Sequence, residues 1–423
     1  MKSIKQFLHF RVRAGILQLT LGISIIISIL CASMIMLAYY TKLHFLDHEI
    51  GLKLRNNALS GINYLMSSDR ASTNFNATHT IDLFGDGTDS VNLTRKPWGI
   101  FELVVSNAIQ GKRKSSRTAM VAYSVNEQGK SALYIPDNNA PVYLAGNALL
   151  KGIVYASSRK FSSGYVDGKD YKRDRFVYGD IKKSEVTIPN LDTILLREIK
   201  NVLELNTNSY ALVSVDRLPV NASFSDSGTQ HYHTSQSIDL EDSICGNLII
   251  QSAIKIRVTA HAKLSDVILI APDIDIDKGF NGSIQCFAER SITVGAESFL
   301  QYPSALVLIG GEKDSTIVIG REAMVQGYVI IQGYDKTIGS RGTLKIEDKG
   351  VLHGMAYING SSDIQGSLWG HLTTRTTQVK LQSTIYGNHI LNGEINALKR
   401  SAFLPASGLW GNSKEMVIAK WLD

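Results

Sequence analysis

The chain has 423 residues, of which 44 are basic and 38 acidic, and its formal net charge is +6. The first 42 positions hold five basic residues and no acidic one, so the rest carries 39 basic against 38 acidic residues, a net charge of +1. A nucleic-acid-binding protein concentrates positive charge in its folded part. This distribution excludes that class, and we expect no nucleic-acid partner.

The first predicted element is a membrane anchor. No charged residue occurs from Ala14 to Thr41, and Ile, Leu, Met and Ala dominate this stretch. As a helix it would span about 42 Å, whereas the hydrocarbon core of a bilayer needs about 30 Å. A cleavable signal peptide has a shorter apolar run of roughly 7–15 residues. We therefore predict a basic tail at 1–13 and an uncleaved transmembrane helix at 14–41.

The flanking charges give an orientation. Four basic residues precede the apolar run, and three follow it within 42–55, mixed with Asp47 and Glu49. An excess of Lys and Arg marks the cytoplasmic side. We expect a cytoplasmic N-terminus and an extracytoplasmic or periplasmic body.

The anchor is predicted to continue outward as a helical stalk and linker over 42–76. Leu46, Ile50, Leu54 and Leu59 recur near helical spacing up to about residue 67. The polar stretch that follows, to Asn76, is typical of a linker.

Residues 77–215 are predicted to form a small mixed α/β region. Trp98–Val105 and Met120–Tyr123 have the composition of strands, and Gly111–Arg117 is a basic loop that we interpret as a solvated hairpin tip. Leu191–Leu205 has the apolar spacing of an amphipathic helix.

Residues 216–400 show short apolar alternations separated by Gly, Asp, Asn or Ser. They fall at 254–258, 267–270, 274–276, 292–294, 317–319 and 344–346, and again at Ile364. Residues 317–327 align with 344–354, since both have an apolar pair two apart and an apolar-x-Gly at the end, and Ile364–Gly370 is a shorter echo. Because one coil of short strands cannot bury its inner face alone, the repeats predict a stacked parallel β-solenoid. A β-sandwich is the main alternative.

The predicted fold class is therefore mainly β, with an N-terminal transmembrane helix, a small α+β region and then a right-handed parallel β-helix. Residues 401–423 are predicted to be a C-terminal cap or tail. Phe403, Leu404 and Trp410 are its candidates for covering the open end of the stack.

The repeat region resembles the bactofilins, a bacterial family of polymer-forming right-handed β-helix proteins. The resemblance rests on the spacings at 317–327 and 344–354 and on the Gly-Ser-Leu-Trp-Gly segment at 366–370. It covers at most the last 160 or so residues, and it implies the β-helix fold and self-association.

The N-terminus is similar to a type IV pilin or pseudopilin segment. A short basic leader is followed by Gly15 and by Ile16–Thr20, which enter the long apolar helix. Thr20 stands where these pilins carry Glu, so an uncleaved or minor-pseudopilin role fits the segment better than processing after Gly15. The whole layout also resembles membrane-anchored proteins of Bacteroidetes-type bacteria.

Three clusters are candidates for chemistry. Asp273, Asp275 and Asp277 alternate with Ile, and on a strand they would share one face; an acid/base or Ca²⁺ row and an ordinary solvated strand are both consistent with this. His231 and His233, near Asp226, would share a face suited to zinc or form a polar loop. Cys245 and Cys286 either form a disulfide or are buried singly.

We predict no catalytic, cofactor-binding or metal-binding residue and no cofactor. The resemblances imply a non-enzymatic structural or assembly protein of the bacterial inner membrane, associated with a pseudopilus or secretion system. Its expected partners are the membrane, other copies of itself and envelope or secretion components. Gly15, Gly22, Ser24 and Ser28 are the small residues that would let anchors approach each other. The alternative is a surface β-helix protein that binds or cleaves polysaccharide.

Overall fold

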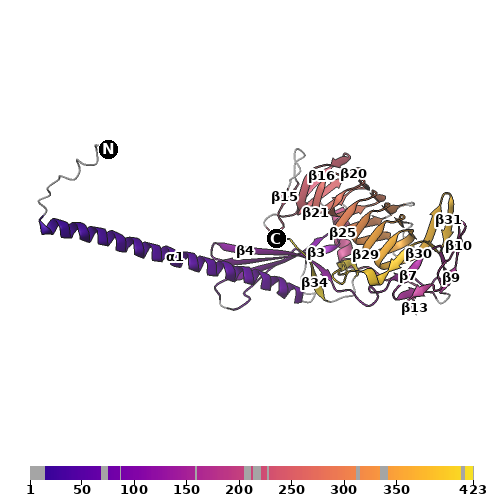
Figure 1. Ribbon diagram of the computed structural model, residues 1–423, viewed down its shortest axis with the longest axis horizontal. Helices are drawn as coiled ribbons and strands as arrows, with labels where there is room; N and C mark the ends of the chain where they lie inside the picture. The colour runs from indigo at the N-terminus through magenta and orange to yellow at the C-terminus, as the bar shows by residue number, and fades with distance from the viewer. Residues whose placement is uncertain are drawn as a thin grey trace, which may run out of the picture.

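The computed structural model describes residues 15–67, 75–85, 87–157, 160–203, 211–212, 221–225, 228–310, 315–333, 342–410 and 415–422. The basic tail at 1–13, most of the predicted linker and Asp226 lie outside these residues. The described chain is mainly β, with one long apolar N-terminal helix and a large parallel sheet (Figure 1).

The N-terminal helix α1 runs without interruption from Ile16 to Ser67. Its 52 residues span about 78 Å at 1.5 Å per residue. The first part projects from the rest of the molecule, and the last part lies against a small sheet (Figure 1). The predicted continuation of the anchor as a helix to about residue 67 is confirmed.

The small sheet is antiparallel, in the order β1-β2-β3-β4-β34. Its strands are β1 (Thr78–Ile81), β2 (Ser90–Trp98), β3 (Phe101–Gln110), β4 (Arg113–Tyr123) and β34 (Met416–Trp421). One face packs on α1, and the other packs on the large sheet.

The large sheet has three parallel ladders, in which strands of successive repeats stack side by side. The first ladder contains β17 (Ile238–Leu240), β20 (Lys255–Val258), β22 (Asp273–Ile276), β24 (Ser291–Val294), β26 (Thr316–Ile319) and β28 (Thr343–Ile346). The second begins with β15 (Asn221–Ala222) and β18 (Ser243–Gly246), and the third with β14 (Ala211–Leu212), β16 (Gln230–Thr234) and β19 (Leu248–Ser252). The longer strands supply their first part to the second ladder and a later part to the third; they are β21 (Lys263–Ile270), β23 (Asn281–Ala288), β25 (Phe299–Gly310), β27 (Met324–Gly333), β29 (Val351–Ile364) and β30 (Ser367–Leu381). β29 and β30 are long enough to continue into the first ladder after β28. Because these pairings are parallel, the β-sandwich alternative is wrong.

The register of the ladders matches the predicted repeat alignment. Ile317 pairs with Leu344, and Gly327 pairs with Gly354. Gly354 in turn pairs with Gly370, as the shorter echo predicts. Alternate apolar side chains of all three ladders point into one continuous buried cluster. Each repeat is therefore one rung of a common core.

Strands from the region before residue 216 extend the same large sheet. They are β5 (Leu133–Tyr134), β7 (Leu149–Lys151), β8 (Val154–Ala156), β12 (Val177–Tyr178) and β13 (Ile181–Lys183). The late strand β33 (Glu394–Asn396) joins β30 on one side and β7 on the other. The predicted division into 77–215 and 216–400 therefore has to be corrected, because β5, β7 and β8 add rungs to the repeat core while β1–β4 form the separate sheet.

Short elements complete the described structure. A three-stranded parallel sheet contains β32 (His389–Leu391), β6 (Val142–Ala145) and β9 (Phe161–Ser163), and β10 (Tyr165–Val166) pairs with β11 (Lys169–Asp170). β31 (Thr384–Gly387) folds back on β30 as a hairpin. The helix α2 (Thr193–Leu203) lies within the predicted range, and the 3₁₀ turns η4 (Ala397–Lys399) and η5 (Gly408–Trp410) follow β33.

The predicted C-terminal cap is also corrected. The ring centroid of Trp410 lies 5.8 Å from that of Tyr328 and 6.5 Å from that of Tyr357, both on the outer face of the third ladder. Leu404 belongs to the same buried cluster, whereas Phe403 is 94% exposed. The segment covers the side of the stack and not its end, because the chain passes there to reach the small sheet as β34.

Candidate functional site: the exposed half of α1 and its support

The first half of α1 is apolar and uncovered. From Ile16 to Leu46, its large apolar side chains are between 42% and 84% exposed. No residue of the most apolar stretch of the helix is buried. Among the described helices, α1 is the one long and apolar enough to cross a membrane. An exposed apolar surface of this size needs lipid or other apolar helices around it.

Several hydroxyl side chains in this half donate hydrogen bonds within the helix. The Thr20 hydroxyl donates to the Leu17 carbonyl at 2.9 Å, and the Ser28 hydroxyl donates to the Ser24 carbonyl at 2.8 Å. Ser33 does the same to Leu30. A hydroxyl bonded to its own helix removes most of the cost of entering a hydrocarbon environment. Thr20 therefore fits a membrane-embedded helix.

The second half of α1 packs tightly on the small sheet. Leu54, Ala58 and Ile62 are at most 1% exposed, in one cluster with side chains of β2, β3 and β4. Gly61 sets the closeness of this packing, since a Cβ there would lie 2.3 Å from the Ser106 Oγ atom. The helix is thus held to the body by a close-packed contact.

Polar groups around the buried Asp89 carboxylate reinforce this contact. The Asn57 amide donates to the Asp89 carboxylate at 2.9 Å, and the Lys53 ammonium pairs with the same carboxylate at 2.8 Å. Farther along the sheet, the Arg95 guanidinium pairs with Glu102, whose carboxylate also accepts a 3.0 Å hydrogen bond from the Tyr123 hydroxyl. Arg95 and Glu102 are at most 3% exposed, so the loss of either charge would leave the other one buried and uncompensated.

The opposite face of the small sheet joins the large one. The Gln285 side-chain oxygen accepts from the Ile100 backbone N–H at 3.0 Å, and the ring centroids of Phe101 and Tyr328 lie 5.5 Å apart. α1, the small sheet and the third ladder therefore form three successive layers, and the large sheet is coupled to the anchor through the small one.

The three aspartates of the predicted acidic row form an ion-pair ladder. Asp273 pairs with Arg290, Asp275 with Lys255, and Asp277 with Arg257 at 2.9 Å, across neighbouring repeats. Burial by itself raises the pKa of Asp273, but hydrogen bonds from Arg290 and Ser291 lower it overall. These carboxylates have basic partners, which favours the interpretation as a solvated, mutually neutralised strand face.

The histidine and cysteine candidates lie on different strands of the large sheet. His231 is buried and donates from Nε2 to the Gln251 side-chain oxygen at 2.8 Å, and burial lowers its pKa. His233 is half-buried on the same strand. Among the described residues, no three His, Cys, Asp or Glu side chains are grouped to hold a metal ion. Cys245 and Cys286 form no disulfide, so the disulfide interpretation is wrong; burial raises the pKa of the Cys286 thiol.

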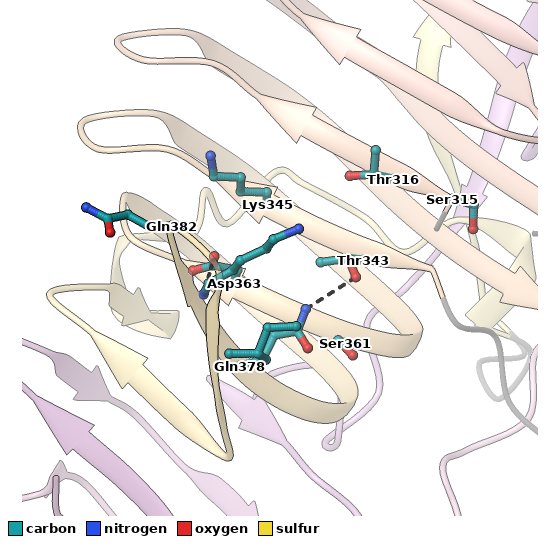
Figure 2. A pocket seen from close by; sticks show the side chains of 10 residues that line it. Ser315, Thr316, Thr343, Lys345, Ser361, Asp363, Gln378 and Gln382 are labelled. Atoms are coloured by element: carbon teal, nitrogen blue, oxygen red, sulfur yellow. Dashed lines mark hydrogen bonds between the residues drawn. The ribbon is translucent and has the colours of Figure 1, made fainter. Parts of the chain in front are cut away.

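A polar groove lies beside the end of the first ladder, under the β30–β31 hairpin (Figure 2). It has a volume of about 600 Å³. The Gln378 amide donates to the Thr343 hydroxyl at 3.4 Å, and Asp363 accepts from Gln365 at 3.1 Å and from the Lys380 backbone N–H at 3.2 Å. Burial raises the pKa of Asp363. These groups bond to one another across the groove, so we assign it no ligand.

Comparison with known proteins does not assign this chain to a family. No protein-family model matches the sequence, and no curated protein matches it. Among solved structures, the competence-associated pilin ComZ from Thermus thermophilus is similar to this chain at 12% sequence identity and a TM-score of 0.24, over 88% of this chain and 97% of that one. A likeness at this score supports no conclusion, and the function has to be argued from the chain's own residues.

Proposed function

We propose that this chain is a non-enzymatic structural subunit of the bacterial cell envelope, of the pilin or pseudopilin type. It is anchored in the inner membrane by one helix with the N-terminus in the cytoplasm, and it presents a β-solenoid outside. The observation that carries the proposal is the division of α1. One half is apolar and uncovered, and the other half is close-packed on an antiparallel sheet.

This division suits a helix that joins a membrane to a folded body. The charge-free part described from Ile16 to Thr41 spans about 39 Å, enough for the hydrocarbon core. The same helix continues without a break into the packed part that ends at Ser67. A continuous helix transmits position and force between its ends more faithfully than a flexible linker would.

Besides the packing between the two sheets, the chain connects the repeat region to this support at both ends. The chain leaves the small sheet after β4 and returns to it as β34, which pairs with β4. We infer that the three parallel ladders are the three sides of one closed right-handed solenoid, because their inward side chains form a single apolar cluster. Such a solenoid fits a rigid spacer or contact module on the outer side of the membrane.

The uncovered half of α1 is the proposed assembly surface. A Cβ at Gly22 would meet no atom within 4 Å, so this position is open to a neighbouring helix. Ser24 and Ser28 lie on the same stretch, and small residues let membrane helices approach closely. The partners are other α1 helices, from copies of this chain or from other anchored envelope proteins.

Cysteine crosslinking in native membranes tests this proposal. Full-length variants with Gly22→Cys, Ser24→Cys or Ser28→Cys, in a background with Cys31→Ser and Cys245→Ser, are treated with a membrane-permeable oxidant. At least one position is expected to give a discrete crosslinked species. A matched control with a cysteine at the exposed Lys183 is expected to give none. If all three anchor positions stay uncrosslinked, the assembly function is rejected.

A further inference from the structure

The β3–β4 hairpin ends in a basic tip that lies beside α1. β3 ends at Gln110 and β4 begins at Arg113, so Gly111 and Lys112 make a two-residue turn. Gly111 has a φ of +58°, as the first position of a tight hairpin turn requires. Segment 111–117 contains four basic residues and no acidic one. The tip therefore concentrates positive charge at one end of the small sheet.

The packing of the hairpin fixes where this charge lies along α1. Ala108 on β3 belongs to the same apolar cluster as Leu54, and Ile50 packs at its edge. The Arg113 guanidinium pairs with the Asp47 carboxylate. β4 runs alongside α1, and its beginning points back toward the uncovered part of the helix (Figure 1). The tip is thus level with residue 47 of the helix.

Residue 47 is close to the level where the membrane surface must be. Asp47 follows Thr41, the last residue of the charge-free stretch, by about 9 Å along the helix axis. Tyr39 and Tyr40, at least half exposed, mark the interface, where tyrosines of membrane helices gather. The headgroup layer is about 5–8 Å thick on each side of the hydrocarbon core. A lysine side chain at the tip is therefore within reach of the headgroups.

The space between the tip and α1 is hollow and mainly basic. This hollow, of about 520 Å³, is lined by Arg55, Arg113 and Lys114, together with His48. Asp47 is the acidic residue among the described side chains that line it. Guanidinium and ammonium groups bind phosphate oxygens by charge-assisted hydrogen bonds. The hollow has the charge and size to hold a phosphate headgroup.

We propose that the 111–117 hairpin tip and this hollow bind the headgroups of anionic phospholipids in the leaflet that faces the body. The inference rests on the proposed membrane anchoring by α1 and adds a second contact with the same membrane. A helix anchored at one point can tilt and rotate freely. A basic contact beside it fixes the tilt of the body over the surface, and with it the direction in which the solenoid points.

Hydrogen exchange of the full-length protein in lipid nanodiscs tests the inference. Exchange of the tip amides is compared between discs of phosphatidylcholine alone and discs that also contain phosphatidylglycerol. Anionic lipid is expected to slow tip exchange by about threefold or more at low salt, because basic side chains near an anionic surface are attracted to it. At about 1 M salt the Debye length is only about 3 Å, and the slowing is expected to disappear.

Two variants distinguish slowing caused by the tip lysines from slowing caused by the overall charge of the protein. The double substitution Lys112→Glu and Lys114→Glu is expected to abolish the slowing. The control substitutions Lys169→Glu and Lys183→Glu change two exposed lysines of β11 and β13, and they are expected to leave it intact.

Three outcomes overturn the inference. One is equal exchange in both lipid compositions by protein that has inserted normally. Another is slowing that persists in the double variant. The third is the same slowing by inorganic phosphate in phosphatidylcholine discs, which would assign the hollow to a free anion. Failure of the protein to insert at all would instead reject the anchoring, so the two failures are distinguishable.

Discussion

Replacing Ile62 by alanine tests the contact between α1 and the small sheet. Ile62 is fully buried in the cluster that joins the helix to β2, β3 and β4. Truncation of a buried isoleucine to alanine costs about 2–5 kcal/mol, depending on how far the site collapses. Collapse is restricted here, because the neighbouring Gly61 already brings the helix so near that a Cβ would lie 2.3 Å from Ser106. Alanine gains at most about 0.5 kcal/mol of helix propensity.

The expected net loss is therefore about 3 kcal/mol in the free energy of opening of the small sheet. Native-state hydrogen exchange of β3 and β4 amides in the full-length protein measures this quantity locally. Leu59→Ala is the matched control, since Leu59 lies on the same helix and is 41% exposed. It is expected to cost less than about 1 kcal/mol. Equal losses in the two variants would refute the packing of α1 on the sheet.

Three further substitutions probe the repeat core and the buried charges. Gly354→Ala places a Cβ 1.7 Å from the Gly327 carbonyl oxygen of the preceding repeat, and we expect a loss above about 3 kcal/mol in the free energy of thermal unfolding. The control Gly387→Ala, where a Cβ would meet nothing within 4 Å, is expected to be nearly neutral. Glu102→Gln removes the negative charge that pairs with the buried Arg95 cation. We expect it to lower the free energy of unfolding in urea by about 3–5 kcal/mol. An unchanged urea midpoint would contradict this expectation. Burial lowers the pKa of His371 to about 4 from its ordinary 6.5. Because the unfolded chain then binds the proton more readily, stability is expected to be full above about pH 6.5 and to fall by about 3 kcal/mol between pH 6.5 and 4. His371→Gln should remove this part of the pH dependence, as measured by urea midpoints across that range.

The repeat core is predictable because its signal is local and recurrent. Inward Ile and Leu positions alternate along each short strand, and the alignment of 317–327 with 344–354 gives the strand register directly. The same is true of α1, because its apolar run and its continuation to about residue 67 lie in one continuous segment of the sequence. Local periodicity predicts such elements without knowledge of their neighbours.

The support of α1 is not predictable in this way. Met416 pairs with Tyr123 across nearly 300 residues, and no short motif marks such a non-local pairing. The pairing of β33 with β7 also joins segments far apart in the sequence. The role proposed for the basic loop 111–117 is not predictable from the sequence either, because the position of the loop along α1 depends on how β3 packs against the helix. Asp273, Asp275 and Asp277 look like a candidate site in the sequence until their basic partners on neighbouring repeats are located.

Membrane extraction combined with protease protection tests the central claim most directly. Membranes that contain the full-length protein are washed with alkaline carbonate, and sealed vesicles of known orientation are then treated with protease. We predict that the protein stays in the membrane fraction and that its body, from the small sheet onward, is cleaved only from the extracytoplasmic side. Release into the carbonate wash, or cleavage of the body from the cytoplasmic side, would contradict the account.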